Sequence, residues 1–292
     1  MSPRVPKIAL RKIVLAVIGL VVLIYAGAGI YLYTQQRHLL YLNRPGAETP
    51  DIAGLAISDV RIPTPDGETL EAWYAPPQPG KPIILFLHGQ QASLRLGKWR
   101  YIAMHKEGVG FLALAYRGFS GSTGSPTEKG LLIDGLAAYD WLRAKGFADK
   151  DIVLHGHSLG TGVATYIASQ RPARAVILEA PFTAAVDVAQ ERYPFMPVGL
   201  VMQDQFRNRD RIKDVHIPLM IVHGTADMTV PFAEGQRLFA LANAPKVFVA
   251  MPGSGHNTLV HDGMYDRVWP FLGLAKVDVD PGLVFAPNRR GH

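Results

Sequence analysis

One segment of the sequence has the residue types of a serine nucleophile. The apolar run Ile152 to Leu154 leads into the pentapeptide GHSLG, Gly156 to Gly160, and a run of small residues follows from Thr161. A sharp turn between a strand and a helix exposes the hydroxyl of its serine, and glycine on each side removes Cβ atoms that would clash there. The pattern therefore predicts that Ser158 is a nucleophile in acyl transfer.

A serine nucleophile needs a histidine that takes its proton and a carboxylate that holds this histidine in the right tautomer. Asp227 follows the apolar run Leu219 to Val222. His256 follows the next apolar run, Val247 to Ala250, in a glycine-rich loop. The carboxyl ends of neighbouring parallel strands share one edge of a sheet, so both side chains can reach the serine. Ser158, Asp227 and His256 are the predicted catalytic triad, in the chain order typical of such a turn.

Other acidic residues and histidines compete for these two roles. Asp187 and Asp204 lie in the segment 181–215, away from the strand ends. Asp227 itself could instead be a turn residue or a helix cap. The remaining histidines near the site are expected to be structural: His155, His157, His223 and His261. His155 and His157 have no carboxylate at metal-ligand spacing, so the sequence predicts no metal site.

Acyl transfer also needs N–H donors for the oxyanion that develops on the attacked carbonyl. One donor is expected to be the backbone N–H of Leu159, directly after the nucleophile and at a helix N-terminus. The other is expected in the His-Gly loop after the apolar run Ile83 to Leu87, where Gln90 is the predicted donor. The glycines at 108 and 110 precede a predicted strand, whereas a dinucleotide fingerprint follows one, so no cofactor is predicted.

These candidate residues lie in a chain of alternating strands and helices. Strands are predicted at Val60–Ile62, Glu71–Tyr74, Ile83–Leu87, Gly110–Ala115, Ile152–Leu154, Ala175–Leu178, Leu219–Val222 and Val247–Ala250. Helices are predicted at Lys98–Lys106, Leu131–Lys145, Thr161–Ser169, Phe232–Ala242 and Leu259–Leu272. The alternation predicts a mostly parallel, twisted sheet with helices on both faces, opened by a hairpin at residues 65–67. The aromatic and methionine residues of segment 181–215 predict a short lid over the site.

The beginning of the chain has the pattern of a membrane anchor. The 21 residues from Ile13 to Tyr33 carry no charge, and this length matches a helix that crosses a bilayer once. Four basic residues precede this run and two follow it, which predicts a cytoplasmic N-terminus and a periplasmic or lumenal hydrolase domain. The stretch Ala26 to Ala28 resembles a cleavage site, so a cleaved signal peptide is the alternative.

Composition and charge limit the classes of partner. Six of the 30 basic residues precede Glu48, the first acidic residue, so the rest of the chain carries 24 residues of each sign. The basic flank suits anionic lipid headgroups, and nucleic acid is not a predicted partner. There is no cysteine, which excludes disulfides and a thiol nucleophile. The predicted parts are a basic flank 1–12, a transmembrane helix 13–33, a connector 34–58, a domain 59–275 with the lid, and a poorly ordered tail 276–292.

Together these residues resemble the membrane-anchored α/β-hydrolase-domain proteins, whose members include protein depalmitoylases and lipid esterases. The resemblance extends from the apolar segment and residues 36–41 to about Leu272. The motifs that carry it are LFLHG at Leu85–Gly89, YRGFSG at Tyr116–Gly121 with Gly124–Pro126, GHSLG at Gly156–Gly160, EAPF at Glu179–Phe182, HGTAD at His223–Asp227 and GSGHN at Gly253–Asn257.

The resemblance implies the α/β-hydrolase fold and carries over Ser158, Asp227 and His256 as the triad. Ala115 stands where an aspartate commonly precedes the Tyr-Arg-Gly turn, and two glutamines at 90–91 replace the usual Asn-Ala. The second departure bears on the acyl pocket.

The function predicted from these residues is that of a serine hydrolase. It would cleave carboxylic esters or thioesters with an apolar acyl group through an acyl-enzyme on Ser158. The substrate would be lipid-like or acylated, and the N-terminal helix would hold the enzyme at the membrane. A peptidase or amidase that uses the same triad is one alternative, and a binding protein that retains only the fold is another.

Overall fold

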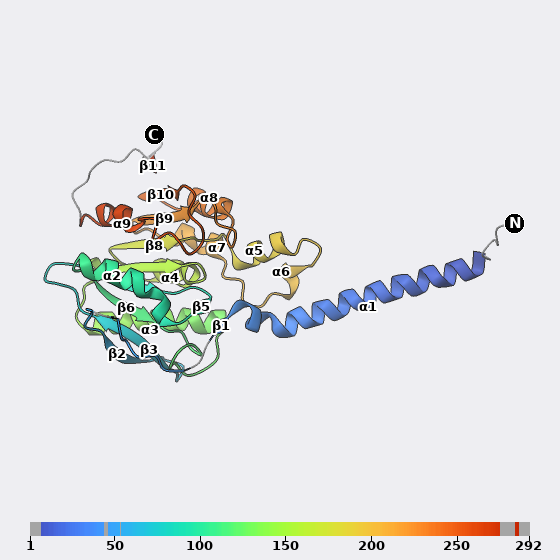
Figure 1. Cartoon of the computed structure of the whole chain (residues 1–292), viewed down its shortest axis with the longest axis horizontal. Coiled ribbons are helices and arrows are strands. Elements are labelled where there is room, and N and C mark those ends of the chain that lie inside the picture. Colours follow the sequence, from blue (N-terminus) through green and yellow to red (C-terminus); the bar gives the residue numbers. More distant parts are fainter. Residues whose placement is uncertain (1–6, 44–45, 53, 275–283, 286–292) are drawn as a thin grey trace.

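The computed structural model describes residues 7–43, 46–52, 54–274 and 284–285, and within them a nine-stranded sheet forms the centre. Its strand order is β11-β10-β9-β8-β7-β4-β6-β3-β2 (Figure 1). The bounds are β2 Ser58–Pro63, β3 Thr69–Ala75, β4 Ile83–Leu87, β6 Gly110–Leu114, β7 Ile152–His157, β8 Ala175–Glu179, β9 Leu219–Gly224, β10 Lys246–Met251 and β11 Val284–Phe285. All neighbouring pairs from β6 to β10 are parallel, and β2, β3 and β11 pair antiparallel.

Helices cover both faces of this sheet (Figure 1). The helices that pack on it are α2 Lys98–Lys106, α3 Glu128–Ala144, α4 Gly160–Gln170, α8 Phe232–Leu241 and α9 Tyr265–Phe271. Successive side chains of a strand point to opposite faces. Phe86 therefore contacts Tyr101 of α2 and His155 contacts Tyr265 of α9 on one face, while α3, α4 and α8 pack on the other. The predicted mostly parallel sheet with helices on both faces is confirmed.

Short elements complete the domain near the carboxyl ends of the strands. Between β8 and β9 lie α5 Ala185–Arg192, α6 Val198–Val201, α7 Asn208–Arg211 and the 3-10 helix η3 Ile212–Asp214. Two further 3-10 helices are η1 Leu94–Gly97, which follows β5, and η2 Asp149–Asp151, which directly precedes β7 and therefore lies at the amino end of that strand. A two-stranded parallel sheet pairs β1 Leu42–Asn43 with β5 Gln91–Ala92. This small sheet joins the end of the N-terminal helix to the loop after β4.

The N-terminal helix α1 is longer than the apolar run predicts. It spans Lys7–Leu40, and the most apolar 18-residue window within Leu10–Leu40 has a mean hydropathy of 2.7 and is not buried, so the helix is long and apolar enough to cross a membrane. The expected connector from residue 34 therefore begins as helix. Residues 34–40 contain no proline or glycine, and Gln36 and Arg37 bond to the segment 201–204, which stabilises the extra turns.

The rest of the expected connector also belongs to the folded domain, because Tyr41 and Ile52 are buried in the main hydrophobic core. A second difference concerns α9, which begins at Tyr265 and not at Leu259. Gly263 has φ of 86°, a left-handed conformation that interrupts a right-handed helix. Of the tail 276–292, for which poor order is expected, only β11 lies within the described residues.

Candidate active site

The backbone at the end of β7 turns sharply and presents Ser158. Ser158 has φ of 51°, in the left-handed region that non-glycine residues seldom adopt. A Cβ on Gly156 would overlap the carbonyl of Gly160, and a Cβ on Gly160 would overlap the carbonyl of Leu87. Only glycine fits at both positions, so the GHSLG pattern marks a real steric requirement at this turn.

The three residues of the predicted triad lie within hydrogen-bonding distance of one another. His256 Nε2 is 2.9 Å from Ser158 Oγ, and His256 Nδ1 is 2.7 Å from Asp227 Oδ2. Asp227 follows β9 and His256 follows β10, which are parallel neighbours in the sheet. The two side chains therefore meet at the shared edge of the sheet, as the positions of the apolar runs predict.

Asp227 is fixed from several sides. Its Oδ1 accepts the backbone N–H groups of Thr229 at 2.8 Å and Val230 at 2.9 Å. Its Oδ2 is 3.3 Å from His223 Nε2, in addition to the bond from His256. Burial by itself raises the pKa of Asp227, but the hydrogen bonds from His223 and His256 outweigh this effect and hold the pKa well below its usual range. Asp227 is therefore a carboxylate near neutral pH.

His223, which the sequence suggests is structural, thus contacts the same carboxylate as His256. Its Nε2 lies 3.1 Å from the carbonyl of Val230, so this ring nitrogen carries the proton. His223 is buried and contacts Oδ2 of Asp227, the same oxygen that His256 contacts. Its contribution is to orient Asp227, and no local sequence signal distinguishes this role from packing at a strand end.

The two predicted oxyanion donors flank Ser158. Within the described part of the chain, the backbone N–H groups of Gln90 and Leu159 have no hydrogen-bond partner. The loop that carries Gln90 passes close to the nucleophile, since a Cβ on Gly89 would be 3.1 Å from Ser158 Cβ. Leu159 lies at the N-terminus of α4, where the helix dipole favours negative charge. Both N–H groups are thus free for an acceptor beside the serine hydroxyl.

A cavity of about 370 Å³ opens at Ser158, and we refer to it as the Ser158 pocket. It is lined by Phe86, His88, Gly89, Gln90, Ser93, Leu96, Gly97, Arg100, His157, Ser158, Thr229, His256 and Asn257. These residues come from the loop after β4, from α2 and from the strand ends. The segment 181–215 supplies none of them, so its role as a lid over the site stays a prediction.

The rival residues have other contacts. Asp187 accepts a hydrogen bond from Thr183 at 2.9 Å and pairs with Arg209. Asp204 pairs with Arg37 of α1 at 3.0 Å. The ring of His261 lies 5.3 Å from that of Trp99. Metal chemistry has no candidate ligand cluster either, because no group of three or more His, Cys, Asp or Glu side chains in the described ranges could hold an ion.

A buried ion pair lies beneath the pocket, and the sequence does not predict it. Arg100 of α2 makes two hydrogen bonds to Glu179 at the end of β8, through Nη2 and, at 3.0 Å, through Nε. His155 Nε2 is 3.1 Å from the same carboxylate. Burial by itself raises the pKa of Glu179, but the Arg100 charge together with His157 and the hydrogen bond from His155 keeps the pKa well below its ordinary value. The EAPF motif marks Glu179 as notable, but nothing local indicates its partner 79 residues earlier.

His157 connects this pair to the triad. Its Nε2 is 3.4 Å from the carbonyl oxygen of His256 and 3.9 Å from Glu179 Oε1. Burial lowers the pKa of His157 to about 3, so the ring is neutral at physiological pH. A neutral His157 donates to the carbonyl of His256 and supports the loop that carries the predicted base.

Comparisons with known proteins identify the family and the fold. The model of the prolyl oligopeptidase family matches residues 114–272. An uncharacterized protein of Mycobacterium tuberculosis is 35% identical over 248 residues, which cover 83% of this chain and 88% of that protein. The lysophosphatidylserine lipase ABHD12 of Xenopus tropicalis is 33% identical over 183 residues, which cover 55% of this chain and 47% of the lipase. A solved esterase of Pyrococcus furiosus, at 19% identity and a TM-score of 0.65, covers 79% of this chain and 96% of its own and shares the fold.

The family match covers more than half of the chain and includes β7 with its nucleophile turn and the strand ends that carry Asp227 and His256. The mycobacterial relative extends the similarity over most of both chains. The chain therefore belongs to the prolyl oligopeptidase family, and it is a serine hydrolase with the α/β-hydrolase fold.

Proposed function

We propose that this hydrolase cleaves esters of lipid-like substrates through an acyl-enzyme on Ser158, while α1 anchors it in a membrane. The observation that carries the proposal is the continuous hydrogen-bond chain from Ser158 Oγ through His256 to Asp227, with distances of 2.9 Å and 2.7 Å. This is the arrangement in which a histidine base activates a serine hydroxyl.

The proposed mechanism assigns a task to each of these groups. Ser158 Oγ attacks the ester carbonyl carbon, and its proton passes to His256 Nε2. The resulting oxyanion accepts hydrogen bonds from the N–H groups of Leu159 and Gln90. The C–O bond then breaks, and the leaving alcohol takes the proton from His256. Water, deprotonated by His256, attacks the acyl-enzyme next, which releases the carboxylic acid and restores the Ser158 hydroxyl.

Two observations support a lipid-like ester. One relative is a lysophosphatidylserine lipase, although the chain spans about half of its length. The Ser158 pocket also adjoins the end of α1, since Gln90 Nε2 bonds to the carbonyl of Leu39 at 3.2 Å. A substrate held in a bilayer would therefore reach the serine over a short path. The ester and thioester forms share this mechanism, and a panel of acyl esters and thioesters graded by chain length separates them.

The family name gives a specific reason to weigh a peptidase as well, because members are described as prolyl oligopeptidases. An amide substrate would use the same three residues. Comparing turnover of a nitrophenyl ester with that of a peptide nitroanilide decides between the two. We expect the ester to turn over and the anilide to be inert, and the reverse preference would favour the peptidase.

Fluorophosphonate labelling tests the role of Ser158. The wild-type chain is expected to react covalently, and Ser158→Ala is expected to abolish labelling and to lower ester turnover by at least about a thousandfold. Ser169→Ala on α4 is the matched control, since Ser169 Oγ bonds only to the neighbouring Tyr166 carbonyl and to Gln170. Labelling that persists in Ser158→Ala and disappears in another serine variant would assign the nucleophile elsewhere.

A further inference from the structure

The segment 193–201 follows α5 and includes α6, and it lies along the N-terminal helix (Figure 1). Tyr25 of α1 donates a hydrogen bond to the carbonyl of Phe195 at 2.5 Å. Gln36 donates to the carbonyl of Val201 at 3.2 Å and accepts from the N–H of Gln203 at 2.7 Å. This segment, which we call the α1-side loop, is thus fixed to the helix at two levels.

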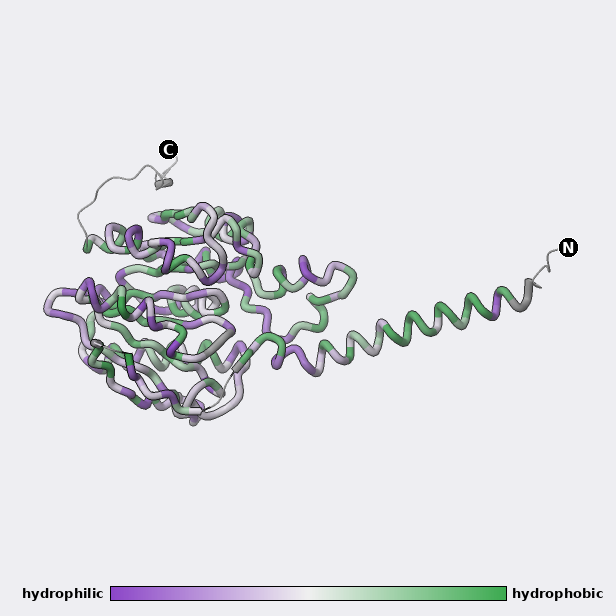
Figure 2. The backbone as a smooth tube through the Cα atoms, viewed as in Figure 1, coloured by the Kyte–Doolittle hydropathy of each residue, from purple (hydrophilic) through white to green (hydrophobic). Residues whose placement is uncertain are grey.

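The α1-side loop exposes large apolar side chains. Phe195 and Leu200 are each 88% exposed, although a soluble surface usually covers such side chains when they cluster. Figure 2 shows apolar residues along α1 and on the neighbouring loop. The exposed side chains of the loop therefore continue the apolar surface of α1, which is exposed along the run from Ile13 to Tyr33.

Most carbonyl groups of the loop have a hydrogen-bond partner within the protein. In hydrocarbon every backbone polar group must find a partner within the protein. Pro194 and Pro197 have no N–H to satisfy. The side-chain amide of Gln190 donates to three carbonyls of the loop, at 3.4, 3.4 and 3.1 Å, those of Tyr193, Pro194 and Met196. Tyr25, Gln36 and Gln205 donate to the carbonyls of Phe195, Val201 and Gly199.

The contact with Tyr25 sets the depth of the loop. Tyr25 precedes Tyr33, the end of the uncharged run, by eight residues, which is about 12 Å along a helix at 1.5 Å per residue. Helical side chains lean toward the N-terminus, so the Tyr25 hydroxyl lies no nearer to the domain than its own backbone. If α1 spans a bilayer, Phe195 therefore lies deeper in the bilayer than the membrane–water interface on the domain side.

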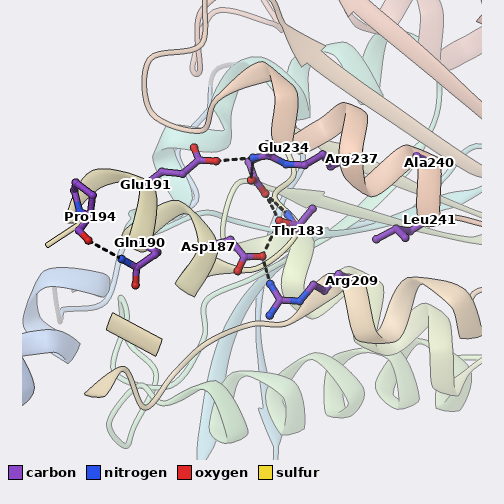
Figure 3. A pocket seen from close by; sticks show the side chains of 10 residues that line it. All are labelled: Thr183, Asp187, Gln190, Glu191, Pro194, Arg209, Glu234, Arg237, Ala240 and Leu241. Atoms are coloured by element: carbon purple, nitrogen blue, oxygen red, sulfur yellow. Dashed lines mark hydrogen bonds and ion pairs between the residues drawn. The ribbon is translucent and has the colours of Figure 1, made fainter. Parts of the chain in front are cut away.

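The helix α5, which leads into the α1-side loop, is polar and held by the domain (Figure 3). Glu191 at the end of α5 pairs with Arg237 of α8 at 2.6 Å, and Asp187 pairs with Arg209. These residues line a cavity of about 700 Å³ between α5 and α8. The polarity thus changes along the segment, from charged side chains at the domain to aromatic and aliphatic ones at the far end.

From these observations we infer that the α1-side loop inserts into the same bilayer leaflet that α1 crosses on the domain side. The inference rests on the anchoring role proposed for α1. Two points of insertion fix the tilt and rotation of the domain, whereas a single helix leaves the domain free to swing. They hold the Gln90 loop, and with it the mouth of the Ser158 pocket, toward the lipid headgroups.

Site-directed spin labelling tests the insertion, because the chain has no cysteine of its own. Phe195→Cys and Leu200→Cys would each carry a nitroxide in full-length protein reconstituted into phosphatidylcholine and phosphatidylglycerol nanodiscs. Both labels are expected to be more accessible to oxygen than to a water-soluble nickel chelate, as a label in lipid is. Leu23→Cys in α1 is the positive control. Lys145→Cys, exposed beyond the end of α3, is the aqueous control.

The controls separate the two proposals. If the label at 23 lies in lipid and those at 195 and 200 match the aqueous control, the anchor stands and the insertion of the loop is wrong. Nickel access at all three positions would reject the anchor and the insertion together. Neither outcome depends on enzyme activity, so a different reaction at Ser158 would leave the inference intact.

An activity measurement adds a functional readout. The double variant Phe195→Ser with Leu200→Ser is expected to hydrolyse a soluble nitrophenyl ester as the wild type does. Its turnover of a long-chain acyl ester embedded in vesicles is expected to fall about tenfold, because the pocket is no longer held at the lipid surface. Leu241→Ser, which removes an exposed apolar side chain from α8, should change neither rate. Equal vesicle turnover in the double variant and the wild type would contradict the inference.

Discussion

At the scale of single residues, Ser158 owes the direction of its hydroxyl to the backbone. Its φ of 51° lies in a region that costs an ordinary side chain about 1–2 kcal/mol. The conformation is stable because the flanking glycines leave room for the carbonyls of Gly160 and Leu87. This strain aims Oγ at His256 before any substrate arrives, so little reorganisation is needed for proton transfer.

His88 stands behind the same site as a buried, neutral ring. Its Nδ1 lies 2.7 Å from the carbonyl of Gly89, and the rings of Tyr116 and Phe119 pack against it at 4.4 and 5.2 Å. Burial lowers the pKa of His88 to about 4. A charged His88 would sit in this apolar environment without a carboxylate contact among the described residues. The loop after β4, with the predicted oxyanion donor Gln90, therefore depends on His88 remaining unprotonated.

We predict that His88 makes the fold sensitive to mild acid. The unfolded chain binds a proton on His88 below its ordinary pKa of about 6.5, whereas the folded chain binds it only below about 4. The stability that comes from keeping His88 neutral is fully present above pH 6.5 and is lost as the pH drops toward 4. At pH 5 the free energy of unfolding is lower by about 2 kcal/mol. Urea unfolding in detergent at pH 7 and pH 5 measures this loss. Between pH 7 and pH 5, the free energy of unfolding should fall less in His88→Gln than in the exposed-site variant His105→Gln. Equal decreases in the two variants would contradict the assignment.

At the scale of elements, the Arg100–Glu179 pair ties α2 to the end of β8 under the Ser158 pocket. Both side chains are buried, so each charge has lost its water and depends on the other. The pair crosses β7 and β4, the two strands that carry the nucleophile turn and the oxyanion loop. It therefore holds together the elements whose relative position sets the site.

We predict that removing one member of this pair destabilises the fold more than removing both members. Arg100→Met leaves the Glu179 carboxylate buried without its cation and should destabilise the fold by about 3–5 kcal/mol. The double variant Arg100→Met with Glu179→Met should recover most of this loss, since no buried charge remains. Chemical unfolding of the two single variants and the double variant gives the coupling energy. Additive losses would mean that the two side chains do not depend on each other.

The elements differ in how well the sequence predicts them. The strands β4 and β7 to β9 are short buried runs rich in apolar residues, a local signature of a parallel strand covered on both faces, whereas β10 alternates between buried and more exposed residues. The positions of Ser158, Asp227 and His256 follow, because each lies at the end of such a run. The Arg100–Glu179 pair and the contact of Gln90 with Leu39 join residues far apart in sequence. Such contacts depend on packing in three dimensions and leave no periodic trace.

At the scale of the whole molecule, α1 and the α/β-hydrolase domain are not separate parts. The sequence predicts a connector over residues 34–58, since this stretch is polar and contains proline. Tyr41 is nevertheless 1% exposed and packs edge-on against Phe206, while β1 pairs with β5 beside the oxyanion loop. These few buried residues lie within a mostly polar stretch, so the sequence pattern does not indicate that they pack into the domain. The folded domain begins close to the end of α1.

Two truncations test where the domain begins. A chain that starts at Thr34 loses the apolar run but keeps Gln36, Arg37 and Tyr41, so we predict that it folds and hydrolyses soluble esters. A chain that starts at Gly46 also loses Tyr41 and β1, and removal of a buried aromatic side chain alone costs about 3–5 kcal/mol. Thermal unfolding followed by circular dichroism should therefore give a midpoint lower by more than about 8 °C in the shorter chain. Equal midpoints would mean that Tyr41 and β1 belong to the linker, and that the anchor and the oxyanion loop are mechanically independent.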